Sequence, residues 1–212
     1  EAGKRLAAAR RSDLDKIEEQ GATLRAVQAY LASISYADEQ LGRMLDALES
    51  SEYNSNTVIV FWSDHGWHLG EKRHWHKSTL WEESTRIPLI IAAPKLKPGV
   101  CDQPVSLLDL YPTLLDLCGI SGNQQFDGLS LLPQLRVPGT KRQPVVIEFR
   151  KRNAAVRSAR WRYIRYSDDS EELYDHKTDS NEWENLASKS KYKMVKQRLA
   201  KWLPKNLSLI HI

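Results

Sequence analysis

Cysteine and long apolar runs are both scarce in this sequence. Its 212 residues contain two cysteines, Cys101 and Cys118, and they do not form a CxxC pair. This scarcity excludes a dense disulfide framework, and the spacing gives no zinc motif. The two cysteines can form one disulfide or remain two free thiols. No apolar run approaches the roughly 18 residues that a membrane-spanning helix requires, so we expect no membrane span.

A strong excess of charge of one sign is also missing. The formal net charge is +4, which favours anionic partners only weakly. The composition, 41% hydrophobic and 27% charged, is typical of a soluble globular protein, and 212 residues suffice for one domain or slightly more. The totals therefore indicate an ordinary soluble domain.

The two ends of the chain say little about its native termini. The sequence begins at Glu1 without a methionine, inside a charged stretch typical of a helix, so the absence of a signal peptide has no meaning here. The last six residues, 207–212 (LSLIHI), break with the basic amphipathic segment before them. We expect these six residues to be a non-native tail; the alternative is a natural apolar strand.

The first 140 residues show the pattern of an α/β fold. Apolar residues recur at helical spacing over residues 22–49, which predicts a helix with one face packed on a core. Residues 57–62 and 88–93 are rich in β-branched and aromatic residues and predict two buried strands. The loop of about 25 residues between them is long enough to suggest a function. A capping pattern and a terminal glycine predict a second helix at 106–119.

The pattern changes after residue 140. Short runs of strand-forming residues are separated by Gly, Asn, Asp and Ser at hairpin spacing, which predicts a small antiparallel sheet. The predicted strands are 145–149, 154–158, 161–167 and 172–174, and a basic amphipathic helix is predicted at 191–203. We therefore expect two units, residues 1–140 and 141–206, before the tail at 207–212.

One stretch combines many groups that can bind metals and anions. Residues 63–77 (SDHGWHLGEKRHWHK) hold one aspartate, four histidines and three basic residues, directly after the first predicted strand. Ligands of open α/β sheets bind outside the carboxyl ends of the strands. Asp64 offers a hard oxygen ligand, His65 a nitrogen ligand, and Lys77 a positive charge suited to sulfate or phosphate. Gly66 allows a sharp turn. The stretch predicts half of a site for a divalent cation and an anionic ester.

Simpler interpretations exist for each residue taken singly. Asp64 after a strand is commonly only a helix N-cap or a turn residue. His68, His74 and His76 can be surface residues of a polar loop, and Lys77 alone indicates nothing. The combination of a strand, Asp-His-Gly, a long loop and a lysine is what supports the site.

The same stretch carries a family resemblance. Residues 30–94 contain SDHGWHLGE, the lysine after HWH and the STRIPLII strand, and in this order and spacing they resemble the sulfatase family of the alkaline-phosphatase-like superfamily. They are most similar to the iduronate-2-sulfatase branch and to related bacterial sulfatases. Residues 155–187 resemble the small C-terminal subdomain of that family. The resemblance implies part of an alkaline-phosphatase-like sandwich, a mixed sheet flanked by helices, with a small C-terminal antiparallel sheet.

The resemblance also implies roles for matching residues. Asp64 and His65 would be ligands of a divalent cation, which is Ca²⁺ in most sulfatases. Lys77 would bind the sulfate and stabilise charge on the leaving ester oxygen, so that Lys77 and His65 are the implied catalytic residues. Trp67 and His68 would line the substrate side of the pocket. The implied substrate is a sulfated sugar or glycan, and the implied location is the periplasm, the cell exterior or the lysosome.

Part of the family pattern is missing from the sequence. Sulfatases act through a formylglycine made from Cys or Ser in a C-x-P-S-R motif, whereas Cys101 lies in VCDQP and Cys118 lies in LCGIS. In this family the motif precedes the region matched here. We therefore expect a C-terminal fragment of a sulfatase that is inactive alone, because it has no nucleophile, and poorly soluble, because apolar faces would be exposed.

Two other functions compete with this one. A phosphodiesterase or phosphonate hydrolase of the same superfamily also places Asp-His after a strand. A nucleic-acid-binding module is suggested by residues 150–166 (RKRNAAVRSARWRYIRY), which interleave cations with aromatics. Strand alternation gives neither face of that segment a clean basic surface, so we expect a sheet edge with arginine stems packed on rings and no nucleic-acid partner.

The basic helix near the C-terminus has a competing interpretation as well. A basic amphipathic helix can lie on a membrane surface. We instead expect it to pack Met194, Leu199 and Trp202 inward and to expose its cations to solvent.

Overall fold

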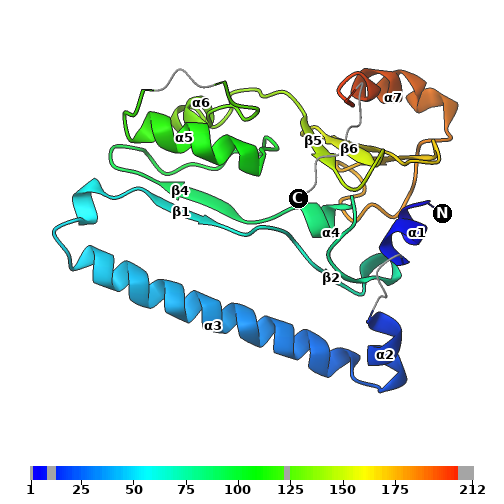
Figure 1. Cartoon of the computed structure of the whole chain (residues 1–212), viewed down its shortest axis with the longest axis horizontal. Helices are drawn as coiled ribbons and strands as arrows, with labels where there is room; N and C mark the ends of the chain where they lie inside the picture. The colour runs from blue at the N-terminus through cyan, green and yellow to red at the C-terminus, as the bar shows by residue number, and fades with distance from the viewer. Residues whose placement is uncertain (1, 9–12, 122–124, 205–212) are drawn as a thin grey trace.

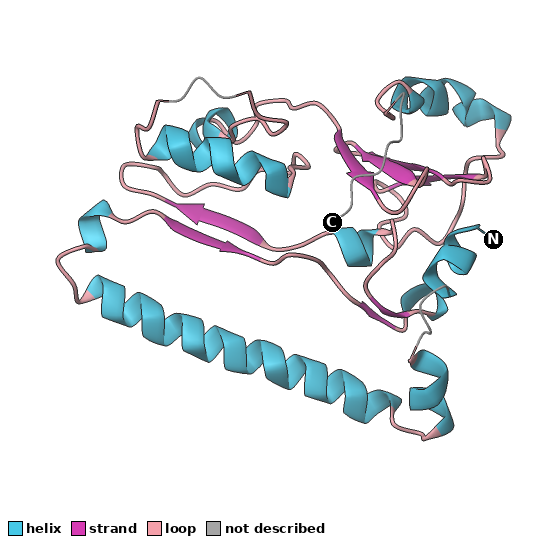
Figure 2. Ribbon diagram, in the orientation of Figure 1, coloured by secondary structure: helices cyan, strands magenta, loops and turns pink. Residues whose placement is uncertain are grey.

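The structure is a computed structural model that describes residues 2–8, 13–121 and 125–204. The predicted tail at 207–212 lies outside these residues. Figure 1 shows a long helix beside a pair of strands, and a separate sheet with helices near it; Figure 2 distinguishes the helices from the strands. The helices that the described residues form are α1 (Ala2–Ala8), α2 (Leu14–Glu19), α3 (Thr23–Glu49), α4 (Glu82–Thr85), α5 (Leu110–Leu117), α6 (Leu132–Arg136) and α7 (Lys193–Ala200). The strands are β1 (Ile59–Trp62), β2 (His68–Leu69), β3 (Trp75–His76), β4 (Leu89–Ala92), β5 (Val145–Glu148), β6 (Ala154–Arg157), β7 (Trp161–Arg165) and β8 (Glu171–Asp175). This α/β organisation confirms the predicted fold class.

Helix α3 confirms the helix predicted at 22–49, but its predicted packing is wrong for this chain. None of its residues is buried, and apolar residues of the predicted inner face such as Leu31, Ile34 and Leu45 are exposed. Within the described residues no element buries this stripe, and Figure 1 shows α3 running along the outside of the molecule. No helix of the described residues is long and apolar enough to cross a bilayer.

Strands β1 and β4 form an antiparallel pair in which Trp62 lies opposite Leu89. Both predicted strands are therefore present, but the expectation that they are buried is wrong, since Phe61, Trp62 and Ile90 are exposed. The physical reason is that β1 and β4 make a sheet of only two strands, and the described residues leave the faces from which its side chains project partly uncovered. All strand pairs of the described residues are antiparallel, so the parallel pairing of a mixed sheet is not formed within this part of the chain.

The long segment between β1 and β4 is ordered by short elements of its own. Strand β2 pairs with β3 in an antiparallel hairpin, with His68 opposite His76. A 3₁₀ turn, η2 (Glu71–Arg73), closes that hairpin, and the single helical turn α4 follows it. The predicted functional loop is therefore a hairpin and a helical turn, which return the chain to β4.

The helix predicted at 106–119 is present as the 3₁₀ turn η3 (Leu107–Asp109) followed by α5. The capping box is formed as predicted: the Ser106 hydroxyl accepts a hydrogen bond from the Leu108 N–H, and the Asp109 carboxylate accepts one from the Ser106 N–H at 2.7 Å. Gly119 follows the helix with a φ of +66°, which suits glycine. The short helix α6 was not among the predicted elements.

Strands β5 to β8 form an antiparallel sheet in sequence order and confirm the predicted C-terminal sheet. Both faces of the sheet are buried. One face packs Tyr163 and Leu173 against Leu199 of α7, and the other packs Ile164 against Trp81 and helix α1. Strand β7 lies between β6 and β8, so its predicted position at a sheet edge is wrong.

Helix α7, preceded by the 3₁₀ turn η4 (Ser190–Tyr192), confirms the predicted basic helix in a shorter form. Leu199 is buried as predicted, but Met194 and Trp202 are exposed, so their predicted inward packing is wrong. Leu199 and Leu203, four residues apart, both lie in the core. Leu199 of α7 therefore faces the sheet, and the exposed Met194 points away from it.

Candidate functional site

The structure brings three of the predicted site residues together after β1. The Lys77 ammonium lies 2.7 Å from His65 Nε2, and an Asp64 carboxylate oxygen lies 3.3 Å from the same nitrogen. The Asp64 side chain is 73% exposed and that of His65 is 31% exposed. Asp64 begins no helix, so the simpler interpretation of it as an N-cap does not apply. The three groups form a small polar cluster open to solvent, which we call the Asp64 cluster.

The hydrogen bonds around His65 determine which of its ring nitrogens is available. Its Nδ1 lies 2.9 Å from the carbonyl oxygen of Gly66, which can only accept, so Nδ1 carries the proton. Nε2 is then an unprotonated acceptor that receives the hydrogen bond of the Lys77 ammonium. A neutral imidazole with an unprotonated Nε2 is also the form that binds metal ions.

Gly66 lets two segments of the backbone approach closely at the site. Its N–H donates to the Ser84 carbonyl of α4 at 2.9 Å. A Cβ atom at this position would lie 1.9 Å from the Glu83 carbonyl oxygen. Only glycine therefore allows the turn after His65 to lie against α4.

The donor set of the Asp64 cluster fits part of a cation site. The exposed Asp64 carboxylate is a hard oxygen ligand, and the His65 Nε2 lone pair lies beside it. These two groups supply only two ligand atoms, whereas Ca²⁺ takes about six to eight oxygen ligands. The remaining ligands of a bound cation would have to come from other groups.

The other two predicted site residues lie in different surroundings. The Trp67 ring packs on the His76 ring, with centroids 4.6 Å apart, and lies 6.3 Å from the His65 ring. His68 is completely buried at 0% exposure. Because a completely buried side chain cannot touch a substrate, the prediction that His68 lines the substrate side of the pocket is corrected. The β-hairpin alternation turns His68 inward, toward α4.

The interpretation of His74 as a surface residue is also wrong, because it is only 1% exposed. Its ring meets the His68 ring edge to face, with centroids 5.1 Å apart. Burial, with a further contribution from His74, lowers the pKa of His68 to about 4, and burial lowers the pKa of His74. Both rings are therefore neutral at pH 7.

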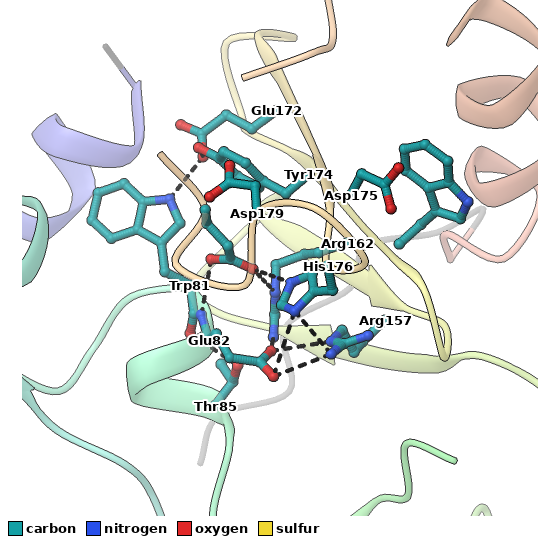
Figure 3. Close-up of polar contacts among 12 residues, drawn as sticks. Trp81, Glu82, Thr85, Arg157, Arg162, Glu172, Tyr174, Asp175, His176 and Asp179 are labelled. Atoms are coloured by element: carbon teal, nitrogen blue, oxygen red, sulfur yellow. Dashed lines mark hydrogen bonds and ion pairs between the residues drawn. The ribbon is translucent and has the colours of Figure 1, made fainter. Parts of the chain in front are cut away.

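A second polar group, which sequence reasoning missed, lies between α4 and the C-terminal sheet (Figure 3). Glu82, His176 and Glu182 have ligand atoms within 4.8 Å of one another. Arg162 of β7 pairs with both glutamates, and its Nε lies 2.6 Å from Glu182. Arg157 of β6 donates to Glu82 at 3.1 Å and 3.2 Å. We call these five residues the Glu82 network.

The charges of the Glu82 network balance without a metal ion. Burial alone raises the pKa of Glu82, but the hydrogen bond from Arg157 and the charge of Arg162 outweigh it and lower that pKa to about 2. Both carboxylates are already neutralised by guanidinium groups, which a cation would have to displace. The network therefore joins α4 to the sheet and is not a metal centre. No local motif could have revealed it, because its members are up to 100 residues apart.

The aromatic and basic strand β7 offers no platform for nucleic acid. The rings of Trp161, Tyr163 and Tyr166 are all buried, and Arg162 is only 1% exposed. Stacked bases need accessible ring faces and cations. This burial argues against the nucleic-acid-binding alternative.

Both cysteines are free thiols in the structure, which decides between the two alternatives that the sequence left open. Cys101 is half-buried and Cys118 is exposed. The fold of the described residues therefore has no disulfide between them.

Comparison with known proteins gives family matches over nearly the whole chain. A sequence model of the family described as "Sulfatase" matches residues 2–120, and one described as "N-sulphoglucosamine sulphohydrolase, C-terminal" matches residues 70–208. A protein named "Sulfatase" from Formosa agariphila is 44% identical over 183 residues, which are 85% of this chain and 36% of that protein. A "Choline-sulfatase" from Rhizobium meliloti is 41% identical over 172 residues, 77% of this chain and 33% of that protein. The chain thus spans about a third of the length of these relatives.

Solved structures agree with the sequence matches. A protein solved with its substrate D-glucosamine-2-N,6-O-disulfate has a TM-score of 0.70 and 32% identity, over 81% of this chain and 38% of that one. A phosphonate monoester hydrolase of Agrobacterium radiobacter has a TM-score of 0.67 and 27% identity, over 79% of this chain and 38% of that one.

Proposed function

Since this chain belongs to the sulfatase family, we propose that the protein it forms part of hydrolyses sulfate esters and that the Asp64 cluster is this chain's share of the active site. The observation that carries the proposal is the convergence of Asp64, His65 and Lys77 directly after β1. Hydrolysis breaks the bond between sulfur and the ester oxygen, and water supplies the hydroxyl and the proton that end on sulfate and on the alcohol.

Each residue of the cluster has a chemical role in this proposal. Asp64 and His65 would hold a divalent cation, Ca²⁺ by resemblance to the family, which would supply positive charge to offset that of the sulfate. Lys77 donates to the sulfate and to the ester oxygen as that oxygen takes up negative charge. Trp67, beside His65, forms a wall on the substrate side.

The nucleophile in this proposal lies outside the 212 residues. No C-x-P-S-R or S-x-P-S-R motif for a formylglycine occurs in the sequence, and the chain spans about a third of the curated relatives it matches. We propose that residues 1–140 are the C-terminal part of a catalytic domain and that residues 141–206 form a small C-terminal subdomain. We also propose that this chain alone is inactive. An exported or lysosomal location follows from the same resemblance.

The substrate is proposed as a sulfated sugar. The support is the likeness to a protein solved with D-glucosamine-2-N,6-O-disulfate. The iduronate-2-sulfatase branch remains a prediction from the motif. Phosphonate ester hydrolysis is the second candidate, and the likeness to a phosphonate monoester hydrolase favours it; the higher identity to sulfatases places it second.

The test is an assay of the complete protein that contains this chain, with Ca²⁺ present. The substrates are glucosamine 6-sulfate, 4-nitrophenyl sulfate and a 4-nitrophenyl phosphonate ester. We expect hydrolysis of the sulfates to exceed that of the phosphonate. Lys77→Ala should lower kcat about 10²- to 10³-fold, because a charge-stabilising donor at the reacting oxygens is lost.

Lys151→Ala is the matched control, since Lys151 lies in an exposed turn before β6. It should retain the activity of the wild-type protein. A preference for the phosphonate ester would favour the second candidate function, phosphonate ester hydrolysis. Hydrolysis by the 212-residue chain alone would overturn the proposal that the nucleophile lies elsewhere.

A further inference from the structure

The backbone of Lys77 is held by a buried histidine. His74 Nε2 lies 2.9 Å from the Lys77 carbonyl oxygen. A carbonyl only accepts, so His74 donates from Nε2 and is a neutral Nε2–H tautomer. The His74 ring is 1% exposed, and the edge-to-face contact with His68 limits its rotation. The position of Lys77 therefore depends on a side chain that no solvent or substrate touches.

The second buried histidine starts a chain of hydrogen bonds toward α4. The Thr79 hydroxyl donates to the Ser84 hydroxyl at 2.9 Å, so its oxygen accepts from His68 Nε2 at 2.8 Å. Thr79 is 5% exposed and Ser84 is 6% exposed. The chain from His68 to Ser84 is thus closed to water, where a lost hydrogen bond leaves an unpaired polar group.

The same residue of α4 holds the other side of the site. The Ser84 carbonyl oxygen accepts the N–H of Gly66, the residue that follows His65. The backbone beside His65 and the backbone of Lys77 are therefore both attached to one buried assembly. The assembly consists of His74, His68, Thr79 and Ser84, and we call it the histidine brace.

We propose that the histidine brace sets the distance between Lys77 and His65, and that His68, His74 and Thr79 are positioning residues of the active site. The proposal rests on the proposed function, because it concerns the same two residues. None of the three touches a substrate; each acts through the backbone or through its neighbour. Positioning matters since a displacement of about 1 Å can lower a rate about 10²-fold.

The first experiment measures geometry in the complete protein that contains this chain and needs no enzymatic activity. Nuclear Overhauser contacts between the Lys77 side chain and the His65 ring report the distance between them. We expect these contacts in the wild-type protein and their loss in His74→Met, which fills a similar volume without a donor to the Lys77 carbonyl. His74→Gln should keep them, because the glutamine amide can donate from nearly the same place.

The second experiment uses the complete protein and two sulfate esters, an alkyl sulfate and 4-nitrophenyl sulfate. A poor leaving group such as an alkoxide needs the Lys77 ammonium far more than 4-nitrophenolate does. We expect His74→Met and Thr79→Val to lower kcat for the alkyl sulfate about 10- to 100-fold with little change in KM, and to lower it much less for 4-nitrophenyl sulfate.

Thr113→Val is the matched control for Thr79→Val. Thr113 is also fully buried, and its hydroxyl donates to the Asp109 carbonyl and accepts from the Leu131 N–H, away from the site. Both variants lose buried hydrogen bonds and stability, but only Thr79→Val should give the leaving-group dependence. The proposal would be overturned if His74→Met and Thr79→Val lowered kcat equally for both esters. It would also be overturned if the contacts between Lys77 and His65 persisted in His74→Met.

The outcomes separate the brace from the proposed function. If Lys77→Ala has no effect on hydrolysis, the proposed role of Lys77 is wrong, and the Nuclear Overhauser contacts still decide whether the brace exists. If Lys77→Ala impairs hydrolysis while the variants of His74 and Thr79 behave like Thr113→Val, the brace is wrong and the proposed function stands.

Discussion

The histidines of residues 65–76 differ because their burial differs. His65 is partly exposed and its ring accepts a hydrogen bond from the Lys77 ammonium, whereas His68 and His74 are buried and hydrogen-bonded to neutral partners. The sequence identifies all of them as polar groups in one loop but cannot rank them. Their division into a solvent-facing residue and two internal ones depends on the pairing of β2 with β3.

The burial of His68 predicts an acid-dependent loss of stability. The unfolded chain protonates this histidine below about pH 6.5, whereas its folded pKa is about 4. The unfolded state therefore binds more protons in that window, and stability, complete above pH 6.5, falls as the pH drops toward 4. The shift corresponds to about 3 kcal/mol. Urea unfolding of wild-type chain and His68→Gln from pH 7.5 to 4 measures it.

The glutamine variant should lack this part of the pH dependence, because it has no group that titrates there. The carboxylates contribute equally to the pH dependence of the free energy of unfolding in the wild-type chain and in His68→Gln. Their contribution therefore cancels when the two curves are subtracted. Parallel stability curves for the two proteins would contradict the prediction.

At the scale of elements, the Glu82 network attaches the loop that carries the site to the C-terminal sheet. Arg162 donates to the Leu80 carbonyl at 2.9 Å and pairs with Glu82 and Glu182, so one strand of the sheet holds both ends of the turn before α4. Trp81 adds a hydrogen bond from its indole to Glu172 of β8 at 2.7 Å. The C-terminal sheet thus holds in place the loop that carries the Asp64 cluster.

Removal of Arg162 should be strongly destabilising. Arg162→Met leaves Glu82 and Glu182 buried with less compensation, and loss of one partner of a buried ion pair costs about 3–5 kcal/mol. The free energy of unfolding in urea measures this cost. Arg152→Met is the matched control, since Arg152 pairs with Asp169 on the exposed surface and such pairs contribute little. Similar small losses in both variants would show that the network does not hold the loop.

The elements themselves were predictable where local patterns are strong. The helical spacing of residues 22–49, the capping box of Ser106 and the alternation of the C-terminal strands all correspond to observed elements. Burial of β1 and β4 and the edge position of β7 were predicted wrongly. Burial and strand order depend on which segments meet, and local sequence does not carry that information.

At the scale of the whole molecule, the exposed apolar stripe of α3 is the feature that most affects behaviour in solution. Leu24, Leu31 and Leu45 are exposed on one face of the helix, and Phe61 and Trp62 are exposed on β1. Large exposed apolar surfaces drive association. We therefore expect the purified chain to self-associate.

Charges placed on that stripe should reduce the association. The double variant Leu31→Glu, Leu45→Glu puts carboxylates on the apolar face, whereas Ala29→Glu, Ala47→Glu puts them on the opposite face of the same helix. Sedimentation velocity should show a smaller average mass for the first variant and no such decrease for the second. Equal behaviour of the two variants would mean that total charge, and not this face, controls association.

The sequence by itself determined the family resemblance, the main elements and the residues of the Asp64 cluster, because strand, motif and spacing are local properties of the chain. Only the tertiary structure decided the rest. It turned His68 inward, joined Glu82 to Arg162 and Glu182 across long separations, and connected Lys77 to Gly66 through the histidine brace. These contacts arise when the hairpin of β2 and β3 packs against α4 and the C-terminal sheet, and packing between distant segments has no local signature in the sequence.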